Sequence, residues 1–149
     1  MPRYWMRRGP YPDEPPVEPG PPGPAFDPLF TIVAAANLAP GMPVYVNGLG
    51  KLAPASAAAL ASSSAVGLCA AATASGFAAP VNCASLSLSN WAAIAGAAAL
   101  SPNQTYYLGV APGTISAVAP STPGLVVVPV GRAVSATTLE ISIAQPVLL

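Results

Sequence analysis

Short apolar runs alternate with Pro-Gly turns from residue 100 to residue 147, and this pattern limits the fold more than any other feature of the chain. The runs are rich in β-branched and aromatic residues, as in 105–108, 125–134 and 138–143. Such runs, separated by turn residues, are typical of a compact all-β unit. We therefore predict an all-β fold, a β-sandwich or barrel-like domain over about residues 29–149.

The same skeleton occurs earlier in the chain, which predicts an internal duplication with halves at about 36–83 and 98–149. The first matching positions are Leu38, Pro40, Tyr45 and Val46, which correspond to Leu100, Pro102, Tyr107 and Leu108. Later matches are Val66-Gly67 with Val130-Gly131, Thr73 with Thr137, and Pro80-Val81 with Pro146-Val147. A repeat of this size cannot bury its apolar face alone. The alternative is that β-domains simply reuse Pro, Gly, Tyr and Val.

Charge is distributed very unevenly along the chain. Seven of the ten charged residues precede Pro28, and only Lys51, Arg132 and Glu140 follow it. A segment of that length ordinarily carries about thirty charged residues. So little charge gives a monomer almost no electrostatic protection against association. We therefore expect a permanent homo-oligomer and favour a homotrimer, although a coding bias towards Ala and Pro would also lower the charge.

Residues 1–28 are expected to form an extended arm. Nine of the twenty prolines lie within residues 1–27, and proline-rich segments adopt polyproline II rather than helix or sheet. The tip combines the aromatic and cationic residues enriched at binding hot spots, namely Arg3, Tyr4, Trp5, Arg7 and Arg8. We predict that these five residues dock on a partner protein, with a solvated tail as the alternative. Nucleic acid is not expected as a partner, because acidic residues follow at once and no basic stripe continues.

The residue types that catalysis requires are scarce. The chain has no histidine and only two cysteines, Cys69 and Cys83, which excludes imidazole ligands, catalytic triads and a complete zinc site. Glu140 is the only carboxylate after Asp27, so one such domain cannot supply the carboxylate pair of a glycosidase. No Gly-rich phosphate loop precedes a helix. We expect no enzymatic activity, no cofactor and no metal.

No segment predicts a membrane span or an export signal. The most apolar stretch, 65–81, is interrupted by Thr73, two glycines and Pro80, and it is too weak for a span. Prolines break up the N-terminus from Pro2 onwards, whereas a signal peptide needs a continuous apolar core. The two cysteines are therefore expected to be free, buried thiols, with a disulfide as the alternative.

Local sequence features predict individual strands, a helical turn and the positions of several side chains. Strands are expected at 30–36, 43–47, 66–72, 77–83 and 86–88, and a short helical turn or loop within 53–64. Trp91 is expected in the core, behind a helix cap at Asn90. Pro129 indicates a bulge or an edge position in its strand. Arg132 and Glu140 should be diagonal neighbours on one face of the last hairpin, and the apolar C-terminus should be buried against the domain or a partner subunit.

A recognisable pattern runs through the second half. It consists of Leu100-x-Pro102, Tyr106-Tyr107-Leu108, Pro112-Gly113-x-Ile115, Pro120 to Gly124, Val130-Gly131-x-Ala133, Thr138-Leu139 and the terminal Pro146-Val147-Leu148-Leu149. The first half has Gly41-x-Pro-Val-Tyr-Val46 and Val66-Gly67-Leu68. In these patterns the chain from about residue 36 onwards resembles the small structural domains of tailed-bacteriophage virions, which occur in capsid decoration (cement) proteins, head fibres and parts of tail fibres. The N-terminal arm matches no pattern of these domains.

The resemblance implies a non-enzymatic virion protein that binds the shell of the major capsid protein, as decoration, cement or head fibre. It also implies a place on the capsid exterior, after synthesis in the cytoplasm of the host bacterium. The alternative is a tail-fibre or tail-tip module that recognises a host surface. The short length and the missing fibrous shaft favour decoration.

Overall fold

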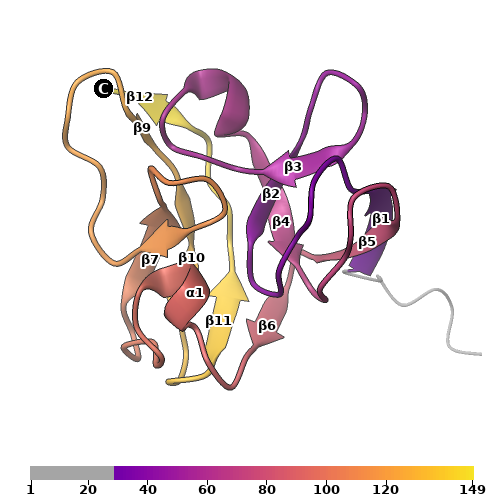
Figure 1. Cartoon of the computed structure of the whole chain (residues 1–149). Helices are drawn as coiled ribbons and strands as arrows, with labels where there is room; N and C mark the ends of the chain where they lie inside the picture. Colours follow the sequence, from indigo (N-terminus) through magenta and orange to yellow (C-terminus); the bar gives the residue numbers. More distant parts are fainter. Residues whose placement is uncertain (1–28) are drawn as a thin grey trace, which may run out of the picture.

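The computed structural model describes residues 29–149, and β-strands make up most of their regular structure. Two five-stranded antiparallel sheets and a two-stranded ribbon form the domain (Figure 1). This confirms the predicted all-β, sandwich or barrel-like fold class. The predicted arm, residues 1–28, lies outside the described residues.

The first sheet has the strand order β1-β5-β4-β2-β3. Its strands are β1 Leu29–Val33, β2 Pro43–Val46, β3 Leu52–Pro54, β4 Ala65–Cys69 and β5 Ala78–Asn82. Just after β1, Ala34 forms a bridge with Leu52 of β3, and the Ala35 N–H donates to the Leu52 carbonyl at 2.7 Å. The two edges of the sheet meet at this point, so the sheet curls towards a small barrel.

The second sheet repeats this arrangement in the order β6-β11-β10-β7-β8. Its strands are β6 Ser85–Ser87, β7 Thr105–Leu108, β8 Ile115–Ser116, β10 Pro129–Ala133 and β11 Thr138–Ile141. The remaining elements are the 3₁₀ turn η1 Leu60–Ser62, the helix α1 Ala92–Ala95 and the ribbon of β9 Val126–Val127 with β12 Val147–Leu148. Without β9, each unit therefore has five strands in the same chain order and the same spatial order.

Tyr45 and Tyr107 occupy the same place in the two sheets. Their cross-strand partners correspond: Ala53 and Ala65 for Tyr45, Ser116 and Pro129 for Tyr107. Beside each tyrosine the ladder skips one residue, Val66 in the first unit and Val130 in the second. Both units thus carry a β-bulge at the same point, and the bulge predicted beside Pro129 is confirmed.

The final part of the alignment between the halves was wrong. Val81 lies opposite Cys69, and Leu139 lies opposite Ala133, so Val81 corresponds to Leu139. Val147, which the sequence matched to Val81, belongs instead to the β9–β12 ribbon. The repeated sheets span residues 29–82 and 85–141. Pro80-Val81 and Pro146-Val147 have the same sequence, but the hydrogen-bonded pairing of the strands determines which positions are equivalent.

Gly67 and Gly131 lie beside the two bulges, where a side chain has no room. A Cβ on Gly67 would lie 2.6 Å from Val81 Cγ1 and 2.7 Å from the carbonyl oxygen of Asn82. A Cβ on Gly131 would overlap the carbonyl oxygen of Glu140. In both units the obstacle is the fifth strand. The Val-Gly pair therefore recurs because the fourth and fifth strands approach closely.

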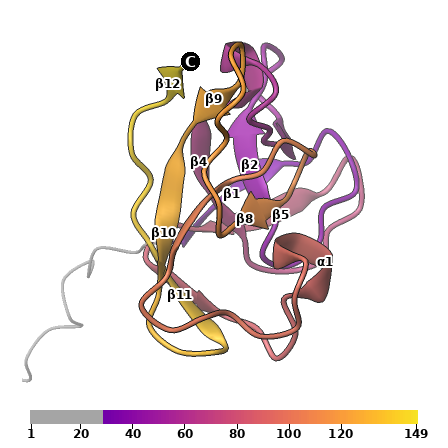
Figure 2. The same ribbon diagram turned by 90° about the vertical axis from the view of Figure 1, so that its left-hand side faces the viewer.

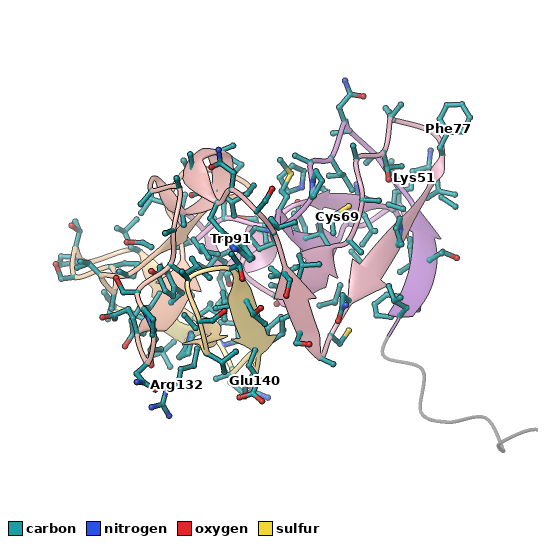
Figure 3. All side chains as sticks on the ribbon, turned by 90° about the horizontal axis from the view of Figure 1, so that it is seen from below. Lys51, Cys69, Phe77, Trp91, Arg132 and Glu140 are labelled. Carbon is teal, nitrogen blue, oxygen red and sulfur yellow. The ribbon has the colours of Figure 1, made fainter. Side chains whose placement is uncertain are left out.

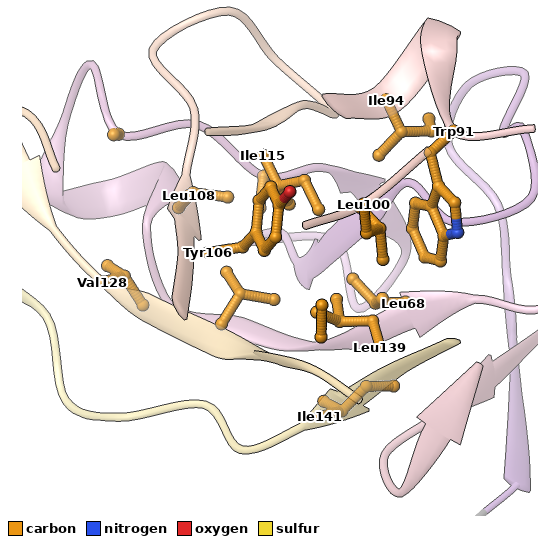
Figure 4. Packing of buried hydrophobic residues seen from close by; sticks show 14 of the residues in the cluster. Leu68, Trp91, Ile94, Leu100, Tyr106, Leu108, Ile115, Val128, Leu139 and Ile141 are labelled. Carbon is orange, nitrogen blue, oxygen red and sulfur yellow. The ribbon is translucent and has the colours of Figure 1, made fainter. Parts of the chain in front are cut away.

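Two hydrophobic cores hold the domain together, and they are built alike. Corresponding buried pairs are Leu38 and Leu100, Val44 and Tyr106, Leu52 and Ile115, Cys69 and Ala133, Val81 and Leu139. The second core is larger, and Trp91 lies at one end of it, beside Ile94 and Leu100 (Figure 4). Leu68, Ala55 and Ala57 from the first unit also belong to it. The two units are thus joined by a shared core.

The other local predictions have mixed outcomes. Each predicted strand overlaps an observed one, and η1 provides the expected short helical turn. Trp91 is fully buried, as predicted, and its Nε1 donates to the Thr137 carbonyl at 2.9 Å. Asn90 Oδ1 accepts the Ala92 N–H at 2.8 Å, but the cap position of α1 is Trp91 and not the predicted Asn90. Arg132, however, lies directly opposite Glu140 and not diagonally. The reason is that the hairpin loop comprises residues 135–137, one position earlier than expected.

The C-terminus is not buried against the described domain, contrary to one form of the prediction. Val147 and Leu148 are each 57% exposed and Leu149 is 45% exposed. The segment passes along the outside of β10 and then pairs with β9 (Figure 2). That pairing satisfies backbone groups without covering the side chains. No helix within residues 29–149 has the length and apolarity to cross a bilayer.

Candidate functional site

The five predicted docking residues, Arg3, Tyr4, Trp5, Arg7 and Arg8, lie outside the described residues. Their proposed role therefore stays a prediction from sequence. Residues 29–149 offer four further kinds of feature that could carry a function: thiols, hydroxyls, surface pockets and exposed apolar side chains.

Both cysteines are free thiols that serve the packing of the first unit. Cys69 is buried and its Sγ donates to the Ala71 carbonyl at 3.0 Å, and Cys83 Sγ donates to the Val66 carbonyl at 3.2 Å. Burial raises the pKa of each thiol above its ordinary value. Because the thiolate is the nucleophile and the metal ligand, neither cysteine is activated at neutral pH.

The buried hydroxyl groups are occupied by the backbone. Ser56 Oγ donates to the Val110 carbonyl at 2.6 Å, and Ser63 Oγ donates to the Leu60 carbonyl at 2.8 Å. A serine nucleophile needs an adjacent general base, and the chain has no histidine. Within residues 29–149 no three Cys, Asp or Glu side chains gather as a metal site.

A polar pocket of about 310 Å³ opens on the outer face of the second sheet. Its lining consists of Thr105, Pro129, Gly131, Arg132, Glu140, Ser142 and Ala144. Arg132 and Glu140 face each other across β10 and β11, and the Arg132 guanidinium donates to Asn103 Oδ1 at 3.1 Å. Figure 3 shows both charged side chains on one side of the domain, away from Trp91. This pocket can offer a cation and a carboxylate to one ligand.

A larger surface pocket, of about 530 Å³, lies between the start of β4 and the C-terminal segment. It is lined by Ser63, Ser64, Ala65, Val66, Ile143, Ala144, Gln145 and Pro146. None of these residues is charged. Recognition in this pocket would therefore rest on shape, apolar contact and neutral hydrogen bonds.

Exposed apolar side chains are the most prominent surface feature of residues 29–149. Thirteen large hydrophobic residues are exposed: Leu29, Phe30, Val33, Val46, Leu49, Leu60, Phe77, Val110, Val118, Val134, Val147, Leu148 and Leu149. Two groups stand out, one along β1 and at Phe77, and one at the C-terminal residues 147–149. Grouped exposed hydrophobics on a soluble domain mark interaction surfaces.

Comparison with known proteins provides no family for this chain. No protein-family model matches it, and no curated protein matches it significantly. The surface itself is therefore the basis for a functional conclusion.

The sequence predicted part of the polar pocket. It placed Arg132 and Glu140 on one face, because strand alternation fixes which side chains share a face. It also placed Ser142 on the face of Glu140, but it did not identify Thr105, which belongs to β7 and lies opposite Arg132. The available signal was the rarity of charge: two of only three charged residues after Pro28 were expected to be neighbours.

Proposed function

We propose that this protein is a non-enzymatic structural protein of a tailed-bacteriophage virion, of the capsid decoration, cement or head-fibre type. The observation that carries the proposal is the surface of residues 29–149, which combines thirteen exposed large hydrophobic residues with three charged ones. Such a surface is expected of a protein that is permanently bound within an assembly. The resemblance of the sequence patterns to virion domains indicates that this assembly is a virion.

The proposed partner is the shell of the major capsid protein, on the capsid exterior. The arm, residues 1–28, would dock on the shell, with Arg3, Tyr4, Trp5, Arg7 and Arg8 as its anchor. A proline-rich arm is already stiff, so it loses little entropy when it lies along another protein. Trp and Arg together can fill an apolar pocket and pair with carboxylates.

Co-sedimentation with capsids that lack the protein tests this proposal. Full-length protein should pellet with the shells, and a variant without residues 1–9 should stay in the supernatant while keeping its β-sheet circular dichroism. Trp5→Ala should weaken binding by at least about 2 kcal/mol. Tyr11→Ala, in the same arm but beyond the anchor, is the matched control and should bind normally. Full occupancy by the truncated protein would mean that the arm is not the anchor.

A second candidate is a tail module that recognises a host surface, and the polar pocket is the observation that favours it. A pocket of about 310 Å³ with Arg132, Glu140, Thr105 and Ser142 has the size and polarity to hold a sugar. Copy number separates the two candidates. Hundreds of copies in each purified virion indicate a capsid lattice, and a handful indicates a tail.

A further inference from the structure

The outer face of the second sheet carries a row of polar side chains that crosses four strands. Thr105 of β7 lies opposite Arg132 of β10. Glu140 of β11 lies opposite Arg132 on one side and opposite Ser85 of β6 on the other. Side chains directly opposite one another in an antiparallel sheet share a face, with Cβ atoms about 5 Å apart. Three residues of this row, Thr105, Arg132 and Glu140, line the polar pocket.

Most of the hydrogen-bonding capacity of the polar pocket is unused within the domain. Arg132 donates one N–H to Asn103 Oδ1 at 3.1 Å, and its other guanidinium donors have no partner among residues 29–149. The Glu140 carboxylate and the hydroxyl groups of Thr105 and Ser142 are likewise without a partner in this part of the chain. The pocket therefore presents a group that only donates, a group that only accepts, and hydroxyl groups that do both.

An aromatic ring borders the polar pocket. Tyr107 comes two residues after Thr105 on β7, so the two side chains share the outer face of the sheet. The residue opposite Tyr107 is Pro129, which lines the pocket. Tyr107 is half-buried, whereas Tyr106 and Leu108 on either side of it are buried. A partly exposed ring beside hydrogen-bonding groups can pack against the C–H face of a sugar while those groups bind its hydroxyls.

The polar pocket adjoins the larger, uncharged pocket. Ala144 lines both of them, and its N–H donates to the Pro129 carbonyl at 3.0 Å, which holds the C-terminal segment beside β10. Beyond Ala144, the side chains of Ser64 and Gln145 make no hydrogen bond within the described domain. Volumes of about 310 and 530 Å³ together give a groove that accommodates several linked sugar units.

We propose that this groove binds a neutral oligosaccharide, with one sugar ring in the polar pocket against Tyr107 and the next units in the uncharged pocket. The two charges determine the class of ligand. An anionic group attracted by Arg132 would lie beside the Glu140 carboxylate, and a cationic group attracted by Glu140 would lie beside the guanidinium. Neighbouring hydroxyl groups of a neutral sugar can accept from Arg132 and donate to Glu140 at the same time. A free amino acid would satisfy both charges but would leave the uncharged pocket empty.

This inference rests on the second candidate function, recognition of a host surface, and it names the ligand class that such recognition would use. It does not involve the arm. Loss of oligosaccharide binding would leave co-sedimentation with capsids unchanged, and removal of residues 1–9 would leave the groove unchanged. The two proposals can therefore fail separately.

Titration of the isotope-labelled, full-length protein with oligosaccharides, followed by its amide chemical shifts, tests the proposal. The probes are linear tetrasaccharides of glucose, mannose, galactose and N-acetylglucosamine, with tetragalacturonate as the anionic comparison. At least one neutral tetrasaccharide should shift the signals of residues that line the two pockets, and it should bind more tightly than its own monosaccharide. Tetragalacturonate should bind at least about tenfold more weakly.

Substitutions within the groove test which residues hold the sugar. Arg132→Ala and Glu140→Gln should each weaken binding of that tetrasaccharide at least about tenfold. Tyr107→Val, which keeps a residue that favours strands, should weaken it similarly, whereas Tyr107→Phe keeps the ring and should bind normally. Ala144→Leu should remove the advantage of the tetrasaccharide over the monosaccharide, because the larger side chain narrows the junction of the two pockets.

Lys51→Ala is the matched control for the loss of a charge. Lys51 is the third charged residue after Pro28, and Figure 3 shows it far from Arg132 and Glu140. This variant should bind the tetrasaccharide as the wild type does. The proposal is overturned if no neutral tetrasaccharide shifts the signals of the groove at about 10 mM, if tetragalacturonate binds best, or if Arg132→Ala binds as tightly as Lys51→Ala.

Discussion

Gly131→Ala is the sharpest test of how β10 and β11 pack. The new methyl group would overlap the carbonyl oxygen of Glu140 and lie 3.1 Å from the Cα of Ile141. Both are backbone atoms of a paired strand, so no side chain can rotate out of the way. The strands must separate, which stretches the hydrogen bonds between them. Overpacking costs about 1–3 kcal/mol, and each lost hydrogen bond adds about 1 kcal/mol, so we expect a loss of about 3 kcal/mol or more.

Gly48→Ala is the matched control for this substitution. No atom lies within 4 Å of a Cβ placed there, and the backbone is not left-handed. Its free energy of unfolding should stay within about 0.5 kcal/mol of the wild type. Denaturant unfolding followed by far-UV circular dichroism gives both values, provided that the m-values agree. A Gly131→Ala protein as stable as the control would refute the close approach of β10 and β11.

Substitution of Trp91 and a change of pH test how much burial in the two cores contributes to stability. Trp91→Ala should lower the free energy of unfolding by about 3–5 kcal/mol, because it empties a fully buried site. Trp91→Phe should lower it less, because it mainly removes the hydrogen bond to the Thr137 carbonyl. The melting temperatures of the two variants should follow this order. Burial raises the pKa of Cys69 and Cys83, so the unfolded chain loses these protons first. Stability should therefore be intact at neutral pH and fall as pH rises above the ordinary thiol pKa of 9.0 towards the raised values. Substituting both cysteines with alanine should flatten that fall, and an unchanged slope in denaturant titrations from pH 8 to 10.5 would contradict the thiol origin.

Strand positions could be predicted from the sequence because Pro and Gly mark where strands end. The Tyr45 and Tyr107 correspondence also followed, since it rests on matched offsets within one strand. The correspondence of Val81 with Leu139 did not follow from the sequence. It depends on the loops β4–β5 and β10–β11, which connect the fourth and fifth strands of the two units and differ in length.

The two sheets are equivalent in topology, yet their outer faces differ in a way that explains the polar pocket. Leu68 and Arg132 occupy corresponding positions, since they precede Cys69 and Ala133 of the two cores. Leu68 turns away from its own core and enters the core of the second unit. Arg132, at the matching place, faces solvent with Glu140 opposite. In repeat proteins the terminal unit has a polar outer face, and Arg132 and Glu140 provide that face here.

Leu68→Ala and Arg132→Ala form a matched pair that tests the shared core. Leu68 is fully buried, so its truncation should cost about 2–5 kcal/mol, whereas Arg132→Ala should cost under about 1 kcal/mol. The Leu68 variant should still unfold in one transition, because the core that it weakens belongs to both units. Two probes follow the units separately in a Trp5→Phe, Cys83→Ala background: Trp91 fluorescence reports the second unit, and labelling of the Cys69 thiol reports the first. Coincident transitions are expected in both variants; labelling of Cys69 at a lower denaturant concentration than the Trp91 transition would show that the units unfold independently.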